Sequence, residues 1–67
     1  MNLHIDCGRE EDGRWLAEIP ELPGVLVYGS AADDALAKAE ILALRVLAER
    51  IEDGGRPIPI SISIRQG

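Results

Sequence analysis

The stretch that decides the fold is SAADDALAKAEILALRVLAERIEDGG, residues 30–55. Residues 31–53 contain neither glycine nor proline, and the Gly-Gly pair that follows is a stop signal, so the stretch predicts one long helix. Ser30 is the expected N-cap, with Asp33 at the third helical position in an arrangement close to a capping box. Apolar residues recur at helical spacing along the expected core face. They are Ala32, Ala35, Leu36, Ala39, Leu42, Ala43, Val46 and Leu47.

A second apolar stripe makes the helix more hydrophobic than one sheet contact requires. It consists of Ala37, Ile41, Leu44, Ala48 and Ile51. One interpretation is a well-wrapped core helix that leaves some aliphatic side chains exposed. The other is that Ile41, Leu44 and Ile51 form a protein–protein surface. The sequence leaves these two interpretations nearly even.

The residues before this helix predict three strands in a meander. Residues 2–8 and 14–19 each alternate between apolar and polar side chains, which is typical of half-buried strands. The turn signal Asp12-Gly13 lies between them, so together they predict a β-hairpin. Two prolines interrupt residues 20–24, and residues 25–28 (VLVY) then predict a short third strand.

A last strand follows the helix. Ile58, Ile60, Ile62 and Ile64 alternate with Pro59, Ser61, Ser63 and Arg65. Proline at its start predicts an edge strand, or a strand whose beginning stays unpaired. The expected fold is therefore α+β, a single domain over residues 1–67 in the order β-β-β-α-β. It consists of a three-stranded meander plus a final strand, with one long helix packed on the sheet.

Composition sets limits on size and partners. The chain has 67 residues and only 3% aromatic side chains, so its core is thin, and we expect a homo-oligomer, a dimer or tetramer. The candidate interface residues are Ile41, Leu44, Ile51, Ile60 and Ile62. The net charge of -5 disfavours unaided nucleic-acid binding and suits a basic protein partner. Without an 18-residue apolar run or a signal peptide, we expect a soluble, cytoplasmic protein that does not enter a membrane.

No catalytic constellation is visible in the sequence. The only histidine, His4, and the only cysteine, Cys7, are three residues apart on one strand, so they face opposite sides and cannot form a dyad. A single cysteine also excludes an intrachain disulfide. Asp6 and Glu18 predict a cross-strand ionic cluster more readily than a metal site. Nucleotide-binding and metalloprotease motifs are absent, so we expect no enzyme, cofactor or metal.

The run from Asp12 to Gly54 resembles the antitoxin domain of the HicB family. The similar pieces come in the family's order along nearly the whole chain. They are Asp12-Gly13, Ala17-Glu18-Ile19-Pro20, Leu22-Pro23-Gly24, Gly29-Ser30, Asp33-Asp34-Ala35-Leu36, Ala39 and Arg56-Pro57-Ile58-Pro59. Val25 stands where many members carry cysteine after the Pro-Gly pair.

The resemblance implies a degenerate ribonuclease H-like fold whose nuclease residues are lost. It also implies an antitoxin-like module that neutralises HicA-type toxins, which are small basic messenger-RNA interferases. The candidate contact residues are Glu18, Glu21, Tyr28 and Ile41. Full antitoxins of the family usually continue into a DNA-binding segment, and this sequence ends at Gly67, so we do not expect operator binding.

Two alternatives to the antitoxin role stay open. One is a self-assembling structural or regulatory domain without a toxin partner, which would use the helical stripe or the final strand. The other is a residual nuclease or metal-binding enzyme that uses Asp6 and Glu40, suggested by fold analogy alone.

Overall fold

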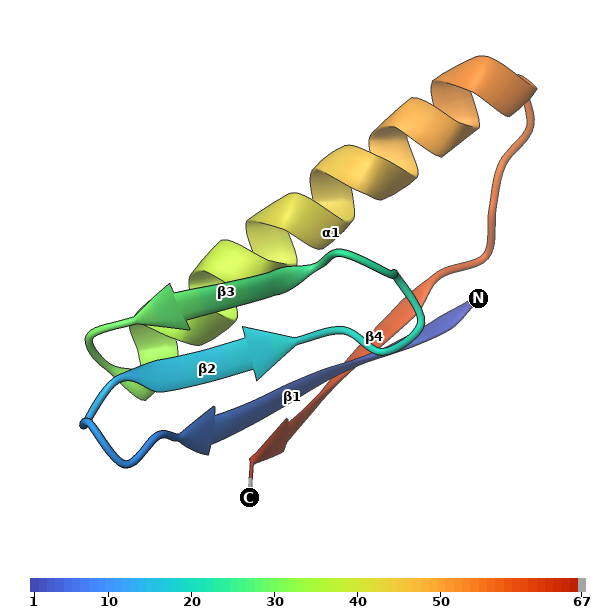
Figure 1. Cartoon of the computed structure of the whole chain (residues 1–67). Helices are drawn as coiled ribbons and strands as arrows, with labels where there is room; N and C mark the ends of the chain where they lie inside the picture. Colours follow the sequence, from blue (N-terminus) through green and yellow to red (C-terminus); the bar gives the residue numbers. More distant parts are fainter. Residues whose placement is uncertain (67) are drawn as a thin grey trace.

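A computed structural model describes residues 1–66 as a four-stranded sheet with one long helix against one face (Figure 1). The elements in chain order are β1 (Asn2–Arg9), β2 (Trp15–Glu18), β3 (Leu26–Gly29), α1 (Ala32–Gly54) and β4 (Ser61–Gln66). The strand order across the sheet is β3-β2-β1-β4. The α+β class and the β-β-β-α-β order expected from the sequence are confirmed.

The first three strands form the expected meander. β1 and β2 are antiparallel, with Asp6 opposite Glu18, and the turn between them places Gly13 at a φ of 91°. That positive φ is the reason a glycine is suited to this turn. β3 adds to β2 antiparallel, and the Ile19 N–H donates to the Val25 carbonyl at 3.1 Å just beyond the ladder. β3 begins one residue later than expected and includes Gly29.

β3 ends directly against the first turn of α1. A Cβ atom at Gly29 would lie 2.6 Å from the Ala35 backbone nitrogen, so only glycine permits this close approach. The expectation that Ser30 caps the helix is wrong. The N-cap is Ala31, which makes no side-chain cap bond among the described residues. Asp34 explains the shift, because its Oδ2 accepts the Ser30 N–H at 3.2 Å and holds Ser30 outside the helix.

The helix packs on the sheet through its smallest side chains. Ala35, Ala39 and Ala43 are fully buried, and Leu47 is 1% exposed, so the helix backbone lies close to the strands. The expectation that Leu42 belongs to this core face is wrong, since it lies at the margin of the stripe and is 36% exposed. On the sheet side and in the loops, the core consists of Leu3, Ile5, Cys7, Ala17, Ile19, Leu22 and Val25.

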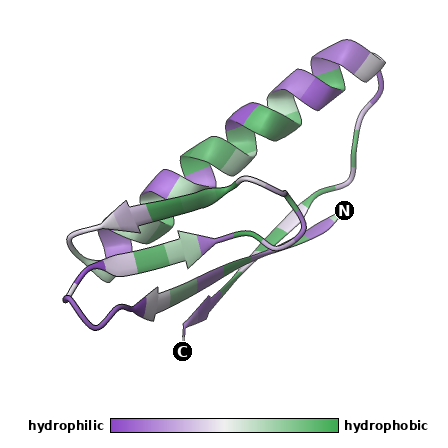
Figure 2. Ribbon diagram, in the orientation of Figure 1, coloured by the Kyte–Doolittle hydropathy of each residue, from purple (hydrophilic) through white to green (hydrophobic). Residues whose placement is uncertain are grey.

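α1 is longer than the sheet beneath it. Its 23 residues span about 34 Å, whereas a four-residue strand such as β2 spans about 13 Å. The last turns therefore extend past the sheet, and Figure 2 shows that they are mostly hydrophilic. Gly55 ends the helix in the left-handed conformation, as expected, with its N–H bonded to the Ile51 carbonyl at 2.8 Å. No helix in residues 1–66 is long and apolar enough to cross a membrane.

β4 returns to the sheet beside β1 and runs parallel to it, with Ile62 opposite Leu3 and Ile64 opposite Ile5. It is an edge strand, as its prolines predicted, although it begins at Ser61 and not at Ile58. Within the described chain, α1 contacts β1, β2 and β3 but not β4. Consequently Leu3 and Ile5 are buried while the neighbouring Ile64 is 58% exposed.

Candidate functional site

The candidate site is the outer face of the sheet, the face turned away from α1. Side chains alternate along each strand, and those opposite the core residues point to this face. They are His4, Asp6 and Gly8 of β1, Leu16 and Glu18 of β2, Leu26 and Tyr28 of β3, and Ser61, Ser63 and Arg65 of β4.

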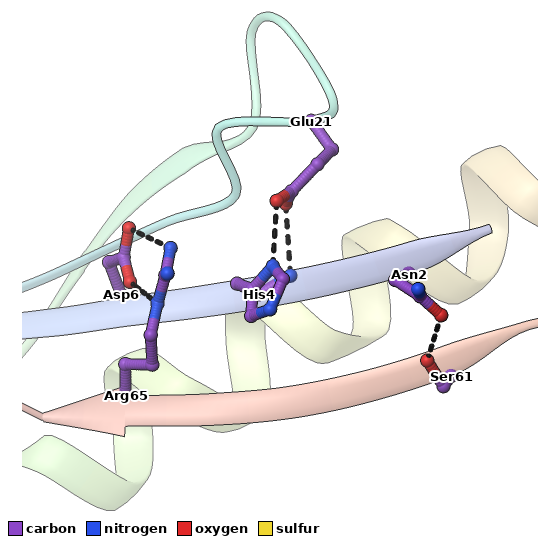
Figure 3. A network of polar contacts seen from close by, with 6 residues as sticks. All are labelled: Asn2, His4, Asp6, Glu21, Ser61 and Arg65. Carbon is purple, nitrogen blue, oxygen red and sulfur yellow. Dashed lines mark hydrogen bonds and ion pairs between the residues drawn. The ribbon is translucent and has the colours of Figure 1, made fainter.

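Asp6 is at the centre of this face and is neutralised from β4. The Arg65 guanidinium donates through Nε to Asp6 Oδ1 at 2.5 Å and through Nη2 to Oδ2 at 3.0 Å (Figure 3). This two-pronged geometry is the strongest form of the arginine–carboxylate pair. The expected cross-strand ionic cluster of Asp6 and Glu18 does not form within β1 and β2, because the cation bound to Asp6 comes from the last strand.

Glu21 binds the first half of β1 from the loop after β2. Its Oε1 accepts the His4 backbone N–H at 2.9 Å, and its Oε2 lies 2.7 Å from His4 Nδ1 (Figure 3). These two hydrogen bonds, the ring bond first, lower the pKa of Glu21 to about 2. An ionised carboxylate only accepts hydrogen bonds, so His4 carries a proton on Nδ1 and is held as a structural partner.

Apolar and aromatic side chains form the β2–β3 side of the face. Leu16 lies opposite Tyr28 in the ladder, and Glu18 lies opposite Leu26. Leu26 is 50% exposed and Tyr28 41% exposed. The Arg14 guanidinium carbon lies 4.3 Å from the centre of the Tyr28 ring, a cation–π distance that fixes the ring on the surface. This side of the face thus exposes apolar area to solvent.

A shallow, solvent-open hollow of about 410 Å³ lies on this face, lined by residues of β1, β2 and β4. Gly8 contributes no side chain there, and Asp6, Leu16, Glu18 and Arg65 form part of the rim. Throughout residues 1–66, no three His, Cys, Asp or Glu side chains converge as metal ligands would. The hollow can accept a protruding side chain of a partner, and Glu18 at its rim makes no ion pair with any other described residue.

The structure brings together three of the four expected partner contacts. Glu18, Glu21 and Tyr28 border the outer face, whereas Ile41 lies on α1, behind the sheet, and is 49% exposed. One flat partner surface cannot cover both, so Ile41 does not belong to this site. Leu26 and Arg65 were missed, although the alternation of each with its strand neighbours places it on the outer face.

The residues of the enzymatic alternative do not converge. Asp6 is on the outer face and paired with Arg65, whereas Glu40 is exposed on α1 on the opposite side of the sheet. Cys7 lies in the core at 4% exposure, and burial raises the pKa of its thiol. His4 and Cys7 face opposite sides of β1, as expected.

The expected oligomer contacts fall into two groups. Leu44 on α1 is 53% exposed and Ile51 is half-buried. Ile60, directly before β4, is 37% exposed, and Ile62 of β4 is half-buried. Ile41 lies on the solvent side of the helix with Leu44. Ile64 was not among the expected contacts, yet it is the most exposed isoleucine of the described chain.

Comparisons with known protein families, with curated proteins and with solved structures gave no match.

Proposed function

We propose that this chain is an antitoxin-like protein-binding module that neutralises a small basic HicA-type messenger-RNA interferase with the outer face of its sheet. The HicB-like sequence pattern motivates the class of partner. A meander followed by a helix and a parallel fourth strand is also consistent with the degenerate ribonuclease H-like fold that the pattern implies.

One observation carries the proposal: the outer face combines uncovered apolar area with an excess of negative charge. Leu26 and Tyr28 supply the apolar part. The three carboxylates of Asp6, Glu18 and Glu21 outnumber the two guanidinium groups at this face, those of Arg14 and Arg65. Such a surface attracts a basic protein over a distance and holds it through its desolvated centre. Covering the catalytic surface of the toxin is then sufficient for neutralisation, and no chemistry by this chain is required.

The test compares two substitutions that change the charge equally on opposite sides of the molecule. Glu18→Lys reverses a charge on the outer face, whereas Glu40→Lys reverses an exposed charge on α1. The probe is a HicA-type toxin encoded by the same host, with binding measured by calorimetry and protection by the growth of cells that express both proteins. We expect Glu18→Lys to weaken binding by roughly tenfold or more, and Glu40→Lys to change it by less than about threefold.

Two outcomes would contradict this proposal. Wild-type chain that neither binds nor protects against such a toxin removes the antitoxin role. Equal weakening by the two charge reversals removes the outer face as the contact, because only unspecific attraction would remain.

A further inference from the structure

The two edge strands of the sheet, β3 and β4, differ in how well their free backbone groups are protected. At the β3 edge, the bond between Ile19 N–H and Val25 O fixes the ladder so that the backbone groups of Leu26 and Tyr28 point away from β2. Lys38 of α1 covers one of them, because its Nζ donates to the Tyr28 carbonyl at 3.3 Å. A short edge strand whose free backbone groups are covered by a lysine side chain resists pairing with another chain. β3 is therefore a protected edge.

The β4 edge is open. The Ser61 N–H donates to the Met1 carbonyl at 2.9 Å, so the odd-numbered residues of β4 direct their backbone groups to β1. Ile62 and Ile64 consequently direct their N–H and C=O groups outward, where no other residue in the described part of the chain pairs with them. This edge runs over six residues, compared with four for β3.

Neither proline nor acidic charge protects this open edge. Pro59 is an odd-numbered position, and its carbonyl accepts from the Met1 amino group at 2.5 Å, so its missing N–H is on the β1 side. Residues 54–66 contain no carboxylate, although the chain as a whole has a net charge of -5. The electrostatic repulsion that keeps two acidic chains apart is thus weakest along β4.

The side chains of this edge are apolar on one face. Ile62 and Ile64 point to the α1 side, beside Leu3 and Ile5. Ile62 is half-buried against the core, whereas Ile64 lies beyond the reach of α1. Ile64 remains 58% exposed for that reason. Open backbone groups and an exposed isoleucine, Ile64, therefore coincide on the same strand.

We propose that β4 pairs antiparallel with β4 of a second copy of this chain, about a two-fold axis through Ser63. In this register, Ile62 lies opposite the partner's Ile64, and Ser63 lies opposite the partner's Ser63. Ile62 and Ile64 become hydrogen-bonded positions, which uses the outward groups of both strands. The β-branched pairs meet on the α1 side, where such pairs stabilise a sheet.

This register also avoids placing like charges opposite each other. Arg65 lies opposite the partner's Ser61, so the two arginines do not face each other, and each is already bound to Asp6 of its own chain. The interface is isologous and closes at two chains. It joins two four-stranded sheets into one, with both helices on the same side and both outer faces free. The dimer contact and the proposed toxin contact are thus different surfaces, and either proposal can fail alone.

A disulfide tests the register directly. The Cα atoms of a non-hydrogen-bonded antiparallel pair lie about 4.5 Å apart, within the range of a disulfide. We therefore expect Ser63→Cys to form a covalent dimer under mild oxidation, at least roughly tenfold faster than Ser61→Cys, whose copies face the partner's Arg65. The native Cys7 does not compete because it is buried. Faster cross-linking of Ser61→Cys than of Ser63→Cys would overturn the register.

Proline variants test which edge is used. Ile64→Pro removes an outward N–H that the monomer does not need, and Leu26→Pro does the same at the β3 edge. Sedimentation equilibrium should give twice the 7.3 kDa chain mass for wild type and for Leu26→Pro, and the single mass for Ile64→Pro. The double variant Ile41→Asp/Leu44→Asp should remain dimeric. Wild type that stays at the single mass up to roughly 1 mM, or a dimer lost only on changing the helix, would overturn the proposal.

Discussion

Glu21 supplies a hydrogen-bond acceptor to the part of β1 that β2 does not reach. β2 pairs with β1 only from Asp6 onward, so the backbone N–H of His4 faces the side of β1 that β2 no longer covers. The Glu21 carboxylate accepts this N–H and binds the His4 ring as well. A loop carboxylate thus completes the hydrogen bonding of β1 where the ladder stops.

Glu21→Gln should lower the free energy of unfolding in a pH-dependent way. The pKa of Glu21 is lowered to about 2 in the folded chain from an ordinary value of 4.5. Its contribution is therefore fully present above about pH 4.5 and is lost as the pH falls through about 2. Urea unfolding of wild type and variant should show the largest difference near neutral pH and convergence in strong acid.

The matched control for Glu21 is Glu11→Gln, which removes an exposed turn carboxylate that makes no hydrogen bond within residues 1–66. Its effect on stability should be small at every pH. A difference for Glu21→Gln that persists unchanged to the lowest pH would show that the carboxylate charge is not what stabilises β1.

At the scale of the elements, α1 divides into a buried stripe and an exposed one. Leu47 is 1% exposed and Leu44 is 53% exposed, three residues apart on the same helix. Because both are leucines and helix propensity changes equally on replacement, the pair isolates the effect of burial.

Leu47→Ala should lower the free energy of unfolding by about 2–5 kcal/mol, the usual loss for a buried leucine. Leu44→Ala should change it by less than about 1 kcal/mol, since an exposed side chain leaves no cavity. Chemical denaturation at one pH measures both. A domain of this length has a stability of only about 3–10 kcal/mol, so the first loss is easily seen. Equal losses would mean that Leu44 is covered in solution.

At this scale, the sequence predicts where the elements lie but not every contact that they make. Alternation of apolar residues located the strands, and the Gly-Gly pair located the helix end, because these signals are local. The N-cap was misplaced because Asp34 binds the Ser30 N–H, a contact that the spacing alone does not reveal. Leu42 was misassigned because helical periodicity does not state how wide a stripe the sheet will cover.

At the scale of the whole molecule, strand order determines what the chain can bind. The sequence predicted that the last strand is an edge, but not that it lies beside β1 and beyond the reach of α1. That placement brings Arg65 to Asp6 and leaves Ile64 uncovered. Candidate residues on the outer face could be named from strand alternation, whereas contacts between distant segments required the fold.

The same arrangement makes β1 the centre of the molecule. It is hydrogen-bonded on both sides, by β2 and β4, and its inner face lies under α1. The end of α1 is the opposite case, because no residue of this helix after Leu47 is fully buried. Elements with few buried contacts open locally, while central ones open only with the whole domain.

Amide hydrogen exchange should therefore separate these two regions. Ile5 and Cys7 of β1 should exchange only through global unfolding, at the free energy that denaturant measures. The amides of residues 49–54 should exchange much faster, although they belong to the same helix as Leu47. A low concentration of urea should increase the exchange rate of the β1 amides and leave the rate at the helix end nearly unchanged. Only global opening exposes a large surface, so only exchange through global opening depends strongly on urea. Equal protection along α1 would instead show that its last turns are covered in solution by another copy or a partner.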